Sequence, residues 1–407
     1  MTELISAAEA REISANIEFI NEEEKVAADI KKAASKKLLA ACFVSLSDKL
    51  TEKLRGLGFV VQARKQGIEV SWDYVEPAYE EVESKDALNE LLAGDEPEVY
   101  AEIKSELTMA KGEYITVPAG KKATIKVDET INVANTCFKV EDGAELILKG
   151  EGEFISANKS TAGAIVEARG QNAVVTIDGP TFDLISQTGK AGNYAFGIYL
   201  MEDASLNFKS GIIRCAYGSC ISTNNTTGGT TVINITGGEL YSDGSYAIYL
   251  ASQGNVNVKG GKVQGINARM GHINVYGDAE IIPTTIDASG YDNIGVEFAT
   301  SGCVWLGDTI AVMAGTYDDA KGIDTSITIS GNATVKSDFR SAIGIYCVDL
   351  NKSQRVKVTV ADASKVTTTD ADFEAIKVYD HAYILEEATK AGKTYVPVAD
   401  SEVEIAA

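Results

Sequence analysis

The chain of 407 residues carries 59 acidic and 37 basic side chains, a net charge of −22, and contains only two histidines and six prolines. This balance argues against a nucleic-acid interface, which needs a basic patch, and against binding to an anionic membrane surface. No apolar run is long enough to span a bilayer, and the N-terminus lacks the basic and apolar regions of a secretory signal. We therefore expect synthesis in a cytoplasm and no export through a signal peptide.

The cysteines form no CxxC pair and no regular framework. Several of them fall inside strand-like motifs, where cysteine behaves as a small apolar residue. We expect free and mostly buried thiols, as in a reducing cytosol, with one disulfide between adjacent coils as the alternative. The six are Cys42, Cys137, Cys215, Cys220, Cys303 and Cys347.

Residues 1–42 are predicted to be a helical segment. Apolar residues recur at steps of three and four with charged residues between them, and Ser6 and Glu9 fit a capping box. The stripe includes Ile13, Ile17 and Ile20. An amphipathic helix needs a partner, which would be another copy of the chain or the module that follows.

Residues 43–73 form a compact βαββ pattern. A strand at 43–46 precedes a capped helix at 47–55, and two further strands at 59–64 and 68–72 read as a hairpin around Gln66-Gly67. The pattern predicts a small α/β module.

This module carries a resemblance in three short stretches, VSLSD at 44–48, LGF at 57–59 and IEVSW at 68–72. The stretch resembles a short N-terminal module of tailed-bacteriophage virion proteins. The resemblance implies a position near the head or baseplate, ahead of variable fibre or decoration domains. We expect docking onto capsid or other virion proteins through the residues Ile13, Ile17, Ile20, Leu46, Leu50, Leu54, Phe59 and Trp72.

Residues 74–110 are predicted to be an acidic linker that contains one short helix. The helix begins at Ser84 and stops at Gly94. Such a helix would cover the open first coil of a repeat domain, whose unpaired edges and apolar interior need protection.

Residues 111–407 contain a loose repeat whose neighbouring units lie about 17 to 33 residues apart, in the range typical of solenoids. One strand motif recurs at 137–140, 164–166, 197–200, 247–250, 342–345 and 375–378, and a second, ending in glycine, at 146–150, 175–179, 232–238, 256–261, 273–277 and 327–331. A unit of short strands cannot bury its own apolar face and must stack on copies of itself. We predict a right-handed parallel β-helix with a C-terminal cap, which resembles the pectate-lyase-like solenoids of phage fibres and tailspikes in fold only.

Two tyrosines occupy the same place in two repeats. Tyr199 and Tyr249 each lie between apolar residues that should point inward, so both are expected on the outer surface as a ladder. The ladder would stabilise the stack, form a subunit interface or bind sugars.

Carboxylates are the realistic source of catalysis in such a fold, because glycoside hydrolases use a pair of them. The candidates are spread singly, which favours solvated turn residues over an active site; they are Glu167, Asp178, Asp183, Asp203, Asp287, Glu297, Asp308 and Asp324. A calcium site at Asp318, Asp319 and Asp324 is a weaker possibility, and the isolated His272 and His381 do not suggest a zinc site. No cofactor is predicted.

The interpretation favoured by these patterns is a non-enzymatic structural virion protein, a head fibre or capsid decoration protein. It would be anchored by its N-terminal module and associate with itself, with a trimer as the predicted state. The alternatives are a tailspike or tail-fibre protein that binds or cleaves host surface polysaccharide, and an adhesin that binds glycans without catalysis.

Overall fold

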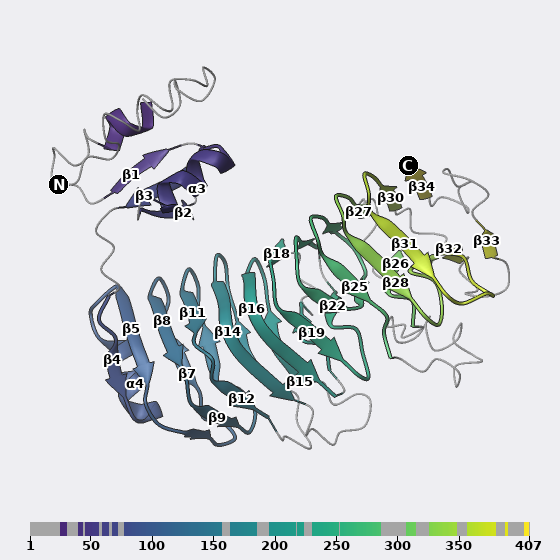
Figure 1. Cartoon of the computed structure of the whole chain (residues 1–407). Coiled ribbons are helices and arrows are strands. Elements are labelled where there is room, and N and C mark those ends of the chain that lie inside the picture. The colour runs from purple at the N-terminus through teal and green to yellow at the C-terminus, as the bar shows by residue number, and fades with distance from the viewer. Residues whose placement is uncertain are drawn as a thin grey trace. The chain divides into compact units, whose positions relative to one another are not determined.

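The computed structural model divides the chain into two compact units, Met1–Ala78 and Tyr79–Ala407 (Figure 1). We call them the N-terminal unit and the β-rich unit. The structure describes residues 25–30, 40–43, 45–56, 59–64, 67–71, 77–156, 163–184, 195–216, 218–223, 230–251, 253–285, 307–314, 325–347, 356–379, 387–389 and 403–406.

The N-terminal unit contains the predicted βαββ order. The strands β1 (Ala40–Phe43), β2 (Val60–Arg64) and β3 (Gly67–Ser71) form an antiparallel sheet in the order β1-β3-β2, and α3 (Asp48–Gly56) connects β1 to β2. The first strand begins at Ala40, earlier than the predicted residue 43, because Ala41 and Phe43 alternate inward onto the core of the unit.

Both helical segments of this unit pack on the same face of its sheet, because their apolar residues share one core cluster with the strands. The cluster consists of Val26, Ile30, Ala41, Leu50, Leu54, Val61 and Val70. Residues 25–30 are helical, as predicted for the segment 1–42. Residues 40–42, which were also predicted to be helical, belong to the strand β1. The other positions of that segment, including Ile13, Ile17 and Ile20, lie outside the described residues.

The β-rich unit is built from three ladders of strands that the chain visits in turn. In ladder 1 every strand is parallel to its neighbours, and the long strands β14 and β16 contribute their first halves. The members of ladder 1 are β4 (Glu80–Val82), β5 (Glu98–Ile103), β8 (Lys122–Val127), β11 (Glu145–Lys149), β14 (Val174–Leu184), β16 (Ser205–Cys215), β18 (Thr231–Ile235), β21 (Gly254–Val258), β24 (His272–Val275), β27 (Thr325–Ile329), β30 (Val356–Val360) and β34 (Val403–Ala406).

Ladder 2 follows ladder 1 in each repeat and includes the second halves of β14 and β16. Its other strands are β6 (Leu107–Met109), β9 (Thr130–Val133), β12 (Glu153–Ile155), β19 (Glu239–Ser242), β22 (Lys262–Gln264), β25 (Glu280–Ile282), β28 (Thr334–Ser337) and β31 (Lys365–Thr368).

Ladder 3 is an 11-stranded sheet, parallel except for its last strand. It contains β7 (Ile115–Val117), β10 (Phe138–Val140), β13 (Gly163–Ala168), β15 (Ala195–Leu200), β17 (Ile221–Ser222), β20 (Ile248–Leu250), β23 (Ile266–Ala268), β26 (Ile310–Ala314), β29 (Ile343–Cys347), β32 (Ile376–Tyr379) and β33 (Glu387–Thr389).

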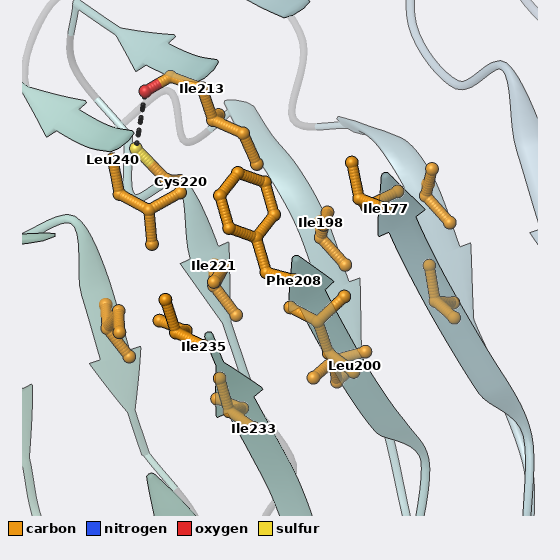
Figure 2. Close-up of a cluster of buried hydrophobic side chains, with 14 of the residues drawn as sticks. Ile177, Ile198, Leu200, Phe208, Ile213, Cys220, Ile221, Ile233, Ile235 and Leu240 are labelled. Carbon is orange, nitrogen blue, oxygen red and sulfur yellow. Dashed lines mark hydrogen bonds between the residues drawn. The ribbon is translucent and has the colours of Figure 1, made fainter. Parts of the chain in front are cut away.

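The three ladders share one apolar interior. Inward residues of ladder 1 lie in register from repeat to repeat, so that Ile177 pairs with Phe208 and Phe208 with Ile235. The buried side chain of Phe208 in ladder 1 lies beside those of Ile198 in ladder 3 and Ile213 in ladder 2 (Figure 2). A mostly β chain with long parallel ladders around a common core is compatible with a β-helix or solenoid.

The repeat begins earlier than the predicted residue 111. Strand β5 pairs with β8 and turns Val99, Ala101 and Ile103 inward, while Glu98 and Glu102 occupy the outward positions between them. Glu98 and Glu102, two of the acidic residues of the predicted linker, therefore lie on the outer face of a strand of the repeat.

The predicted helix at 84–94 is confirmed as α4 (Lys85–Ala93). The Ser84 hydroxyl accepts a hydrogen bond from the Ala87 amide (3.1 Å), and Leu88 and Leu92 are fully buried in the core of the β-rich unit. Asn89 also pairs with the first strand of ladder 3. It donates from Nδ2 to the Tyr114 carbonyl (3.2 Å) and accepts at Oδ1 from the Thr116 amide (3.1 Å). The helix thus covers apolar core and satisfies backbone groups of an edge strand.

Candidate functional site

The residues predicted to dock the N-terminal unit contribute to its own interior. Leu50 and Leu54 are only 3% and 2% exposed, and Leu46 and Phe59 are partly buried against the same cluster. Trp72 lies outside the described residues. Docking through this unit remains a prediction. The buried leucines would contribute to docking only indirectly, by stabilising the fold of the unit.

The opposite face of the sheet in the N-terminal unit is the side that the described helices leave open. Cys42 and Gln62 flank Glu69 in register across the three strands, and Cys42 is exposed. Arg64 and Glu69 form an ion pair at 2.9 Å. This polar face is therefore better placed to contact a partner than the predicted leucines.

The prediction that Tyr199 and Tyr249 form an exposed ladder is wrong for Tyr249. Ser222 lies between Tyr199 and Tyr249 in the register of ladder 3, so the two rings are separated by a strand that lacks an aromatic residue. Tyr249 is only 7% exposed, and the guanidinium of Arg269 lies 5.3 Å from the centre of its ring. Tyr199 is half-buried.

Tyr199 belongs to a mixed aromatic and charged group on the outer side of ladder 3. Its ring stacks on Phe196 with 5.4 Å between ring centres. The neighbouring Glu167 accepts hydrogen bonds from Thr136 and Arg169, both at 2.9 Å. Burial raises the pKa of the Tyr199 phenol, so the ring stays neutral at ordinary pH. We call these residues the Tyr199 group.

The two candidate carboxylates of ladder 3 lie far apart. Glu167 is on β13 and Asp308 lies two residues before β26, with β15, β17, β20 and β23 between those two strands. At about 4.8 Å a strand, the separation is about 24 Å, whereas paired glycosidase carboxylates lie within about 10 Å.

The other carboxylate candidates occupy separate places. Asp178 and Asp183 lie on the two halves of β14, in different ladders. Asp203, in a turn, accepts a hydrogen bond from the Thr230 amide. Asp287, Glu297 and Asp324 lie outside the described residues.

Asp308 is not the solvated turn residue that its sequence context predicts. It is fully buried, accepts a hydrogen bond from the Ser341 amide (3.1 Å), and lies 3.4 Å from Nε of Arg340. The Arg340 guanidinium and the Lys377 ammonium both lie over the ring of Phe373, at 4.7 and 4.1 Å. The group joins the segments that lead into β26, β29 and β32, and within it the charge of Asp308 is paired with that of Arg340.

Within the described ranges, no three histidine, cysteine or acidic side chains gather as a metal site. His272 is exposed, with Nδ1 2.8 Å from the Ser326 hydroxyl. Asp318, Asp319 and His381 lie outside those ranges.

Among the described cysteines, Cys137, Cys215 and Cys220 are buried free thiols and Cys42 is an exposed one. The Cys220 sulfur lies within hydrogen-bonding distance of the carbonyl oxygens of Ile213 (3.4 Å; Figure 2) and Tyr241 (3.0 Å), either of which can accept its single S–H. Burial raises the pKa of the Cys137 and Cys220 thiols, which keeps them protonated and unreactive.

An asparagine row runs along the outside of ladder 1 and was not predicted. Nδ2 of Asn234 donates to Asn207 (3.1 Å), Nδ2 of Asn257 to Asn234 (3.0 Å), and Nδ2 of Asn274 to Asn257 (2.9 Å). The strand register places these four side chains one above another. The sequence pattern that could have predicted this row is an asparagine at the central, outward position of the glycine-ended motif in three successive repeats.

Replacing Asn257 with alanine is expected to lower the free energy of unfolding by about 1–3 kcal/mol. The change removes the hydrogen bonds to Asn234 and from Asn274, each with a net value of about 0.5–1.5 kcal/mol. Urea denaturation followed by circular dichroism would measure the loss. Asn255→Ala is the matched control, since Asn255 lies two residues away on the same face but outside the row; equal losses for both variants would contradict a special role for the row.

The first repeats present ion pairs instead of amides on the outside of ladder 1. Glu102 contacts Lys104 (2.8 Å) and Lys126 (2.9 Å), and Lys126 also contacts Asp128 (2.8 Å). Hydrogen bonds to the two lysines lower the pKa of Glu102, and the bond to Lys126 lowers the pKa of Asp128.

The stabilisation by Glu102 is expected to depend on pH. Because its folded-state pKa is lowered, the contribution should be fully present above its unfolded pKa of about 4.3 and be lost as the pH falls through the folded value. The difference in unfolding free energy between the wild-type protein and Glu102→Gln should therefore shrink below about pH 4.3 and at high salt. Glu96→Gln, at an exposed turn position, is the control. A difference independent of pH would refute the assignment.

A cleft of about 490 Å³ lies at β30, β31 and β32, the last described repeat that contains all three ladders. Val360, Val366 and Ile376 give it an apolar lining, with Lys365 and Glu374 beside them. It is the end of the apolar interior rather than a site with converging polar groups.

No protein-family model, no curated protein and no solved structure matches this chain. In the part of the chain that the structure describes, every helix is too short or too polar to cross a membrane.

Proposed function

We propose that this protein is a non-enzymatic structural component of a tailed-phage virion, a head fibre or capsid decoration protein. The N-terminal unit attaches it to capsid or other virion proteins, and the β-rich unit is a right-handed parallel β-helix displayed on the particle. The observation that carries the proposal is the division at Ala78 and Tyr79. The small α/β unit carries the motifs that resemble virion proteins, and the large unit consists of stacked repeats.

Two further observations support a structural role. The ladders bury apolar residues and the Asp308–Arg340 ion pair, and solenoid repeats contact mainly their neighbours, which suits a rigid spacer or display element. The described carboxylate candidates are also distributed over separate ladders and turns. Copies of the chain associate with one another in this proposal, as a trimer.

The experiment that tests this function is electron cryo-microscopy of phage particles assembled with the full chain or with a chain that lacks residues 1–78. We expect density for the full chain on the head shell, with the N-terminal unit ordered against capsid subunits. The shortened chain should be absent from the particles, although it retains residues 79–407. Incorporation of the shortened chain, or density for the full chain at the tail tip, would refute head attachment through the N-terminal unit.

A second candidate function, binding or cleaving host surface polysaccharide as a tail fibre or tailspike, is favoured by the Tyr199 group. Its stacked rings and its Arg169–Glu167 pair offer the aromatic and polar contacts that sugars use. Isothermal titration of the full chain with host surface polysaccharide would test it. Binding that Tyr199→Ala abolishes and Tyr241→Ala leaves intact would support this function, and absence of binding would reject it.

A further inference from the structure

One outer surface of ladder 1 differs from the rest of this acidic chain. Its members are the outward residues of β16, β18, β21, β24 and β27, which the strand register arranges in two neighbouring rows. We call this surface the amide face. One row is Ser205, Val232, Asn255, His272 and Ser326, and the other is Asn207, Asn234, Asn257, Asn274 and Thr328.

The amide face contains no aspartate or glutamate, although the chain has 59 of them and a net charge of −22. The residues that follow along the same strands on the same side are also free of acids; they are Lys209, Thr236, Lys259, Tyr276 and Ser330. The corresponding outward positions of β5, β8 and β11, in contrast, include the acids Glu98, Glu102 and Glu145. Carboxylates are therefore excluded from one part of the ladder and not from the ladder as a whole.

The amides of this face retain hydrogen-bonding capacity. A carboxamide has two N–H donors and an acceptor oxygen with two lone pairs, and the asparagine row uses one N–H of Asn234, Asn257 and Asn274. All four asparagines are partly exposed. Unused donors and acceptors thus recur at the strand spacing of about 4.8 Å.

We propose that the amide face is the surface through which two copies of this chain contact each other. The inference deepens the self-association in the proposed function and rests on it. Two copies with a charge of −22 each repel one another over most of their surfaces. A face without carboxylates avoids that like-charge penalty, and depletion of charge with exposed tyrosine, here Tyr276 at 37% exposure, is typical of interface cores.

A second copy also fits the spacing of the amide groups. Donors and acceptors on a copy recur with the same strand repeat, so amides can pair in register along the whole face. In the proposed trimer the amide faces of the three copies would converge around a three-fold axis, so that each face contacts the same face of its neighbours. A different protein would need the same period to make equivalent contacts.

The test is sedimentation equilibrium of the full chain as wild type, Val232→Glu and Asn255→Asp. Both variants place a carboxylate on the amide face outside the asparagine row, and Asn255→Asp changes the side chain minimally, so that it serves if Val232→Glu fails to fold. Ile155→Glu is the matched control, since it makes a similar apolar-to-acidic change at a half-buried outward position of ladder 2. Circular dichroism would verify folding.

We expect a wild-type oligomer, at least a tenfold weaker association in both variants, and an unchanged mass for Ile155→Glu. Variants that associate like the wild type would overturn the amide face as the contact and leave self-association standing. A monomeric wild-type chain would overturn both, whether or not another virion protein covers the face. Attachment to particles is measured separately, so its failure would be distinguishable.

Discussion

Replacing Phe154 with alanine is expected to destabilise the β-rich unit by about 3–5 kcal/mol, the usual range for a buried phenylalanine. Phe154 is fully buried, and its ring lies 6.0 Å from that of Phe138 and 4.9 Å from that of Phe182, centre to centre. Phe182 lies on β14, which pairs with the strand of Phe154, and Phe138 lies across the interior on β10 of ladder 3. Both rings are held by paired strands, which limits collapse into the cavity.

Urea denaturation would measure this loss, and amide hydrogen exchange would locate it, because long repeat arrays need not unfold in one step. The matched control is Phe339→Ala, since Phe339 is 40% exposed and its truncation should change stability by less than about 0.5 kcal/mol. A loss at Phe154 as small as that at Phe339 would contradict a stabilising role for these edge-to-face aromatic contacts.

Replacing Gly179 with alanine is expected to lower the free energy of unfolding by a comparable amount, about 2–5 kcal/mol. The loss combines the cost of a positive φ at alanine with overpacking against the preceding repeat. Gly179 has φ of +125°, and a Cβ there would overlap the carbonyl oxygen of Gly150 in the preceding repeat. Neither residue can move away easily, since the backbones of both are held at the corner between ladders 1 and 2.

Gly120→Ala separates the two contributions to this effect. Gly120 has φ of +71° but no atom within 4 Å of the added Cβ, so only the conformational cost of about 1–3 kcal/mol applies. Thermal and urea unfolding of both variants would measure the difference. A loss at Gly120 equal to that at Gly179 would contradict the role of close packing between repeats.

Several elements could be predicted from the sequence because their signals are local. The Ser84 cap, the apolar spacing of Leu88 and Leu92 and the Gly94 stop lie within one short helix. The βαββ order of the N-terminal unit follows from its periodicity and its turn residues in the same way. The C-terminal strand β34 pairs with β30 in ladder 1 and so belongs to the predicted repeat domain.

The burial of outward-facing residues was harder to predict from the sequence. Alternation correctly places Tyr249 and Lys377 opposite the inward apolar residues of their strands, but both are almost fully buried. Their neighbours, Arg269 over Tyr249 and Phe373 beside Lys377, come from other parts of the repeats. A side chain that points outward from a sheet is therefore not always exposed, because segments of different length between the strands can cover it.

The sequence by itself determined the strand type, the inward apolar positions and the repetition, because a two-residue period and glycine at turns act over a few residues. Only the tertiary structure decided which strands are neighbours. That register makes a continuous row of Asn207, Asn234, Asn257 and Asn274, and it separates Glu167 from Asp308. The physical reason is that pairing between repeats depends on the length of every segment between strands, which varies along this chain.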